Sequence, residues 1–138
     1  MTDQAQGRYD VQKFRDLIKD IPFAMFTTVT ADGGLRSRPM VATGSAYDGK
    51  LWFFTRTNSA VAQEIGGTAQ VNVTYVSAPE DRFIAVSGRA TVVRDAARAV
   101  QMWSPSYNQW FAGGASDAEL SMIAIEVFSG PVWPGGSG

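Results

Sequence analysis

Short segments of alternating apolar and polar residues, separated by turn signals, constrain the fold of this chain most strongly. Examples of these turn signals are Ala31-Asp32-Gly33-Gly34 and the hairpin dipeptide Asp48-Gly49. Such closely spaced strands favour an antiparallel barrel or sandwich over βαβ units. Six strands are expected, at Phe23–Thr30, Leu35–Thr43, Lys50–Thr55, Gln70–Ser77, Arg82–Val93 with an interruption at Gly88, and around Ile123–Val127.

A few short helices are expected beside the strands, so the fold class is mainly β with a few α-helices. Apolar residues at helical spacing follow Asp10, which can cap a helix that ends before Pro22. A second helix is expected over Ser59–Ile65, capped by Asn58 or Ser59, and a third over Asp95–Trp103.

The length of 138 residues predicts one domain, over residues 9–133, with flexible tails at 1–8 and 134–138. The longest apolar runs are far shorter than the roughly 20 residues that a membrane-spanning helix needs. The N-terminus also lacks the apolar core of a signal peptide. A cytoplasmic protein without a membrane partner is therefore expected.

The chain contains no His and no Cys, which excludes several kinds of chemistry. Disulfides, Cys/His zinc sites, Ser-His-Asp or Cys-His nucleophiles and histidine-ligated haem are all impossible. The net charge of -1 offers no basic excess for nucleic acid. The carboxylates indicate surface and turn charge rather than an acid/base pair, so we assign no catalytic residue and no metal site.

The segment Arg36-Ser37-Arg38-Pro39-Met40 is a candidate binding segment. Two arginines at i and i+2 of a strand project to one face, where they suit a phosphate or carboxylate. A solvated strand face explains them equally well. Pro39 lacks a backbone donor, which predicts an edge strand or an irregularity.

The segment Phe53–Ser59 runs from a strand end into a helix start. Its hydroxyl and amide groups indicate an anion site at a helix N-terminus, although plain N-capping also accounts for them. Farther along, Trp103–Phe111 contains four aromatic residues. A satellite core, a dimer contact and a cover for a planar ligand remain open for that segment.

The order of these parts resembles the general stress protein branch of the pyridoxamine 5'-phosphate oxidase-like proteins. The motifs are RSRPM, WFFT, an Asn-Ser helix start, VNVTYVS, DRFIAVSGRA and WSPSYNQWF, and together they cover about Val11 to Trp133. The resemblance implies a six-stranded antiparallel split β-barrel of the FMN-binding type. It also implies a homodimer that holds flavin in grooves between the subunits.

The resemblance assigns cofactor binding residue by residue. Relatives usually place a basic phosphate ligand after the Ser that corresponds to Ser59, but here the next two positions are Ala60 and Val61. Arg56 or Arg36 can compensate, because both are expected near the same end. The implied cofactor-binding residues are Arg36, Arg38, Pro39, Met40, Phe54, Thr55 and Ser59.

The function that the resemblance implies is an FMN-dependent oxidoreductase of undefined substrate. One alternative is a non-catalytic protein that binds or stores a flavin or a deazaflavin (F420). The other is a structural dimer without a cofactor, which Ala60 and Val61 would explain. Pyridoxamine 5'-phosphate oxidase activity itself is not expected, because the substrate-binding segment of those enzymes has no counterpart after Trp133.

Overall fold

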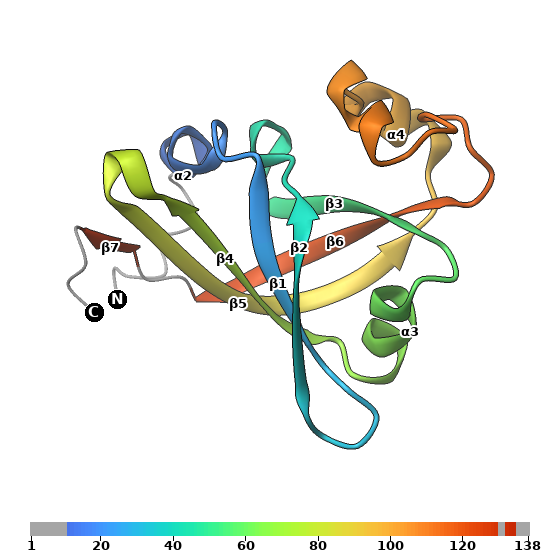
Figure 1. Ribbon diagram of the computed structural model, residues 1–138, viewed down its shortest axis with the longest axis horizontal. Helices are drawn as coiled ribbons and strands as arrows, with labels where there is room; N and C mark the ends of the chain where they lie inside the picture. Colours follow the sequence, from blue (N-terminus) through green and yellow to red (C-terminus); the bar gives the residue numbers. More distant parts are fainter. Residues whose placement is uncertain (1–10, 130–131, 135–138) are drawn as a thin grey trace.

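The computed structural model describes residues 11–129 and 132–134, and an antiparallel sheet that curls into an open barrel dominates it (Figure 1). The strands follow the order β2-β1-β4-β5-β6-β3, and a short β7 pairs with β5. The predicted six-stranded split barrel is thus confirmed, whereas β7 was not predicted. The strands are β1 (Phe23–Val29), β2 (Leu35–Val41), β3 (Lys50–Arg56), β4 (Gln70–Ser77), β5 (Arg82–Val93), β6 (Leu120–Ser129) and β7 (Val132–Pro134).

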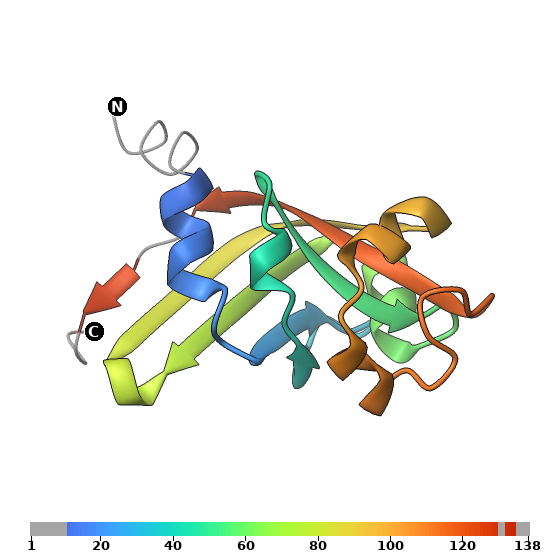
Figure 2. The ribbon, with the colours of Figure 1, turned by 90° about the horizontal axis from the view of Figure 1, so that it is seen from above.

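Within the part of the chain that the structure describes, three α-helices lie against this sheet: α2 (Val11–Ile18), α3 (Ala60–Gly67) and α4 (Ala96–Met102). Short 3₁₀ turns complete the structure as η1 (Gly44–Ala46), η2 (Ala78–Glu80) and η3 (Pro105–Gln109). Viewed from above, α2 and α4 lie at opposite ends of the molecule (Figure 2). The expected caps at Ser59 and Asp95 are present. The expected cap at Asp10 and most of the two expected tails lie outside the described residues.

The first helix ends earlier than the sequence predicts. Its last residue is Ile18, and a turn follows before Pro22. Arg82 of β5 donates a hydrogen bond to the carbonyl of Leu17. That bond satisfies one of the carbonyls that a helix end leaves without an intrahelical partner, so a contact with the sheet accompanies the early end of the helix.

Strand β3 is buried on both faces. Leu51 and Phe53 join the main core, where Phe53 meets Phe26 at a ring-centroid distance of 5.2 Å. Trp52 and Phe54 point the other way, into a second cluster covered by α4 and η3. The alternation in KLWFFT therefore reflects two apolar surroundings rather than one core face and one solvent face.

Two glycines shape the sheet. Gly49 has a φ of +109°, the region that favours glycine, in the predicted Asp-Gly turn. At Gly88 the pairing register with β6 shifts, and a Cβ there would lie 2.4 Å from the Glu126 carbonyl oxygen. The expected interruption is therefore a bulge within one continuous strand, and bulges bend a strand and increase its twist.

The barrel is open between β2 and β3, the two ends of the strand order. These strands approach each other without pairing. Pro39 lies on β2, where the missing backbone donor interrupts no ladder on the outer side. The prediction of an edge strand at Pro39 is confirmed.

Candidate functional site

A groove of about 410 Å³ lies at the opening between β2 and β3. Small-molecule sites commonly have volumes of about 300–1,000 Å³. Five of the seven predicted cofactor-binding residues line the groove, while Arg36 and Pro39 do not. The lining residues are Arg38 and Met40 of β2, Phe54, Thr55 and Arg56 of β3, Asn58, Ser59 and Val61 around the start of α3, and Trp110 and Phe111 after η3.

Hydroxyl groups gather at one end of the groove, where α3 begins. The Ser59 side chain accepts a hydrogen bond from the Ala62 backbone N–H at 3.2 Å, and it lies 2.8 Å from the Thr55 hydroxyl. Thr55 is buried, with 5% of its surface exposed. The N-cap interpretation of Ser59 is thus confirmed. The same arrangement brings two hydroxyls to the positive end of a helix dipole, where an anion is stabilised.

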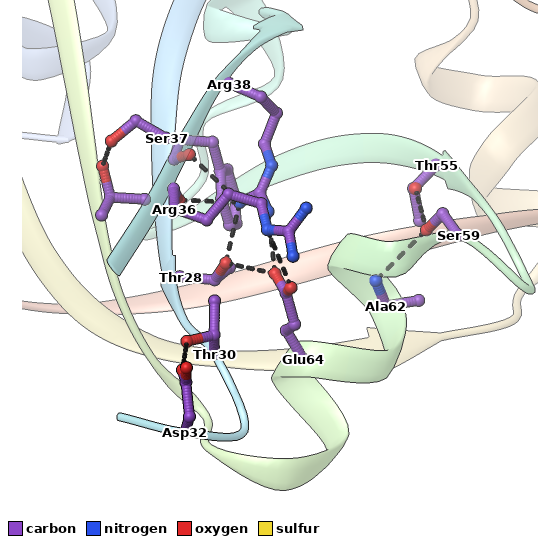
Figure 3. A network of polar contacts seen from close by, with 12 residues as sticks. Thr28, Thr30, Asp32, Arg36, Ser37, Arg38, Thr55, Ser59, Ala62 and Glu64 are labelled. Carbon is purple, nitrogen blue, oxygen red and sulfur yellow. Dashed lines mark hydrogen bonds and ion pairs between the residues drawn. The ribbon is translucent and has the colours of Figure 1, made fainter. Parts of the chain in front are cut away.

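The two arginines of β2 converge on one carboxylate, that of Glu64 on α3 (Figure 3). Arg38 Nη2 lies 2.8 Å from Glu64 Oε1, and Arg36 Nε lies 3.0 Å from Oε2. Their shared face, expected from the i, i+2 spacing, is confirmed by this common partner. The partner itself was not expected, because it is neither a ligand anion nor solvent.

Glu64 is held by more than these two ion pairs. The fully buried Thr28 donates to Glu64 Oε1 at 2.6 Å, and Arg38 Nη1 donates to the Thr28 hydroxyl at 2.8 Å. The Thr28 hydrogen bond, followed by the bond and charge of Arg38 and the charge of Arg36, holds the pKa of Glu64 below its usual value. Glu64 is therefore a carboxylate in this network, and its charge neutralises part of the arginine pair.

The role of Glu64 was missed at the sequence level, although a weak signal exists. Glu64 follows Val61 by three residues and precedes Ile65 by one, and both of these neighbours are buried. An acid beside the apolar face of a helix needs a hydrogen-bonded or charged partner. The sequence does not show which residue that partner is.

Arg56 is the other cation of the groove. It ends β3, exposes 46% of its side chain, and lies with Nη1 3.5 Å from Asp117 Oδ2. Asp117 also accepts a hydrogen bond from the Glu119 backbone N–H at 2.9 Å. Arg56 therefore has one long ion pair, in contrast to the several short contacts of Arg38.

Ala60 and Val61 differ in their surroundings. Val61 is 5% exposed and belongs to the main core, yet it also borders the groove. Ala60 is exposed on the same helix turn. The position at which the resemblance leads us to expect a basic residue is thus an apolar core position in this chain.

Most of the aromatic segment forms a satellite core. Trp103, Tyr107 and Phe111 surround Phe54, with ring-centroid distances of 4.9, 5.8 and 6.2 Å. Trp110 differs in that 50% of its surface is exposed, and it meets Phe23 edge-on at 5.6 Å. Both Trp110 and Phe111 border the groove, so the segment supplies a satellite core and two groove residues.

Two negative findings concern residues 11–129 and 132–134. No helix in this part of the chain is long and apolar enough to cross a membrane. No cluster of three or more acidic side chains in it could hold a metal ion.

A profile of proteins described as pyridoxamine 5'-phosphate oxidase like matches residues 9–138, nearly the whole sequence. The chain belongs to the pyridoxamine 5'-phosphate oxidase like family. The resemblance drawn from the motifs is thereby confirmed. A curated relative in sequence is the protein bli-3 of Neurospora crassa, which is 26% identical over 129 residues. The match covers 84% of this chain and 62% of bli-3, so this chain spans less than two thirds of that relative.

Solved structures agree with this family assignment. The general stress FMN/FAD binding protein of Xanthomonas citri is 27% identical, with a TM-score of 0.74 over 94% of this chain and 92% of that chain. General Stress Protein 26 of Bacillus anthracis is 20% identical, with a TM-score of 0.77 over 90% of this chain and 93% of that one. The split barrel is thus a fold that this family member shares with general stress proteins.

Proposed function

We propose that this protein binds FMN in the groove between β2 and β3 and acts as a flavin-dependent oxidoreductase. The observation that carries the proposal is the convergence of Arg38, Met40, Phe54, Thr55 and Ser59 in one groove of about 410 Å³. These residues come from separate parts of the chain, and the resemblance implied all of them. A related protein that is 27% identical is named for FMN/FAD binding, which supports the same ligand.

The chemistry of the groove residues fits such a ligand. Thr55, Ser59 and the first N–H groups of α3 would hold the phosphate. Met40 and Phe54 would supply apolar contacts for the ring system. When bound, the flavin itself supplies the redox chemistry. None of the described lining residues is a carboxylate or a lysine, so the chain's part is to bind and orient.

We further propose that two copies of the chain form the complete site. Phe23 and Met25 on β1, Val76 on β4 and Trp110 beside the groove are 44%, 43%, 47% and 50% exposed. Apolar side chains exposed next to one another mark association surfaces. Light scattering should therefore give twice the chain mass, and Met25→Asp should shift the protein toward the monomer. A monomeric wild type at micromolar concentration would contradict the dimer.

The ligand is tested by the visible spectrum of freshly purified protein and by the mass of the released chromophore. Bound FMN supports the proposal, whereas a deazaflavin or no chromophore after titration with FMN contradicts it. Thr55→Val should weaken FMN binding several-fold through loss of one hydroxyl contact. Thr43→Val is the matched control, because Thr43 is equally buried, at 4% exposure, but does not line the groove.

A further inference from the structure

We infer that Arg56, rather than the Arg36–Arg38 pair, supplies the positive charge for the anionic end of the ligand, and that Asp117 competes with the ligand for it. The inference rests on the proposed function, since it takes the ligand to carry a phosphate. It adds Arg56 to the seven cofactor-binding residues that the resemblance implies. Three features of the structure support it.

The first feature is that the β2 arginines are already engaged. Arg38 donates through Nη1 to the Thr28 hydroxyl at 2.8 Å and to the Arg36 and Phe26 carbonyls at 3.2 and 3.3 Å. Its Nη2 meets Glu64, which also holds Arg36. A ligand phosphate would have to share these cations with the Glu64 carboxylate, which is also held by the Thr28 hydroxyl. The phosphate and the Glu64 carboxylate are both negative and would repel each other at this distance. The two β2 arginines are therefore a poor phosphate site.

The second feature is the position and freedom of Arg56. It follows Thr55 directly, its carbonyl accepts the Ser59 N–H at 3.0 Å, and its side chain borders the groove. The 3.5 Å separation from Asp117 exceeds the roughly 2.7–2.9 Å of a charge-assisted hydrogen bond. Arg56 can therefore turn toward a groove ligand without breaking a short bond.

The third feature is that Asp117 has a hydrogen-bond partner apart from Arg56. The Asp117 Oδ1 atom accepts the Glu119 N–H at 2.9 Å, and its Oδ2 lies where a Cβ on Gly113 would come within 2.1 Å. The Asp117 carboxylate therefore keeps its hydrogen bond to the Glu119 N–H when the Arg56 guanidinium turns away. Because both anions need the same cation, removal of the Asp117 charge should strengthen ligand binding.

The test compares three charge-neutralising variants in the full chain. Arg56→Gln should raise the Kd for FMN about tenfold, the effect of roughly 1.4 kcal/mol, and leave the Kd for riboflavin unchanged. Asp117→Asn keeps an acceptor for the Glu119 N–H and should lower the Kd for FMN several-fold. Arg94→Gln removes the same charge outside the groove and should leave both values within about twofold. Salt should weaken FMN binding to the wild type more than to Arg56→Gln.

The outcomes separate this inference from the proposed function. If the wild type binds FMN and Arg56→Gln binds it equally well, or loses riboflavin to the same extent, the inference is wrong while the function stands. If Arg36→Gln instead reproduces the phosphate-specific loss, the β2 pair is the phosphate site and the inference is overturned. If the wild type binds neither FMN nor riboflavin, the proposed function fails and the inference fails with it. If Arg56→Gln does not fold, Asp117→Asn decides the inference. A lower Kd for FMN than in the wild type supports it, and an unchanged or higher Kd overturns it.

Discussion

Replacement of Val61 by lysine tests whether a core position at the edge of the groove can be made into a phosphate ligand. Val61 is 5% exposed, packs in the main core and borders the groove. The substitution removes the burial of a valine side chain, at about 1.5 kcal/mol, and introduces an ammonium that must reach water. The lysine stem can pass along the groove wall and keep part of the lost contact. The net loss should be roughly 2–3 kcal/mol, or about 6–12 °C in melting temperature for a domain of this size.

The same variant should bind FMN about tenfold more tightly, a gain of about 1.4 kcal/mol, because its ammonium would lie beside Thr55 and Ser59. Thermal melts without added flavin measure the loss of stability, and titration with FMN and riboflavin measures the gain in affinity. Ala60→Lys is the matched control, since its added charge is exposed and should reduce stability by less than about 1 kcal/mol. Equal melting temperatures for the two variants would refute the core assignment of Val61. An unchanged Kd for FMN in a folded Val61→Lys protein would refute the phosphate position.

Further predictions concern the clamp that Glu64 forms with Arg36 and Arg38, the Ser59 cap and the Gly88 bulge. Glu64→Gln should be less stable than the wild type near neutral pH. The difference in stability between the two proteins should narrow as the pH falls below the usual carboxyl pKa of 4.5. A carboxyl with a lowered pKa stabilises the fold only while it is ionised. Thermal melts of both proteins from about pH 3 to 8 measure this difference. Ser59→Ala should cost about 1 kcal/mol in denaturant unfolding. Ser59→Asp should restore the cap yet weaken FMN binding through charge repulsion. Gly88→Ala should cost about 1–3 kcal/mol by crowding the Glu126 backbone, while Gly67→Ala, which has open space around it, should not.

The strands could be predicted because burial of one face imposes a period of two on the sequence. Gln70–Ser77 shows this directly, since Val71, Val73 and Tyr75 are buried. The three residues of β7 are too few to carry such a period. Likewise, nothing local marks the end of α2 at Ile18, because the contact from Arg82 lies 65 residues away in sequence.

The candidate site could be predicted where its residues are close together in sequence. Thr55 and Ser59 are neighbours in sequence, so a strand end and a helix start bring them together. Arg38 reaches the groove as expected, but its partner Glu64 is 26 residues away on another element. The choice between an internal carboxylate and an external anion depends on where the fold places α3 relative to β2, which a local pattern does not contain.

The clamp between Glu64 and the β2 arginines also bears on the entropy of binding. Arg38 and Met40 line the groove from β2, while Ser59 and Val61 line it from the start of α3, so the clamp ties two lining segments together. A site whose width is set before the ligand arrives loses little conformational freedom on binding, and this preorganisation strengthens affinity without any added contact. The Glu64 carboxylate that engages the β2 arginines thus also joins the edge strand of the open barrel to α3.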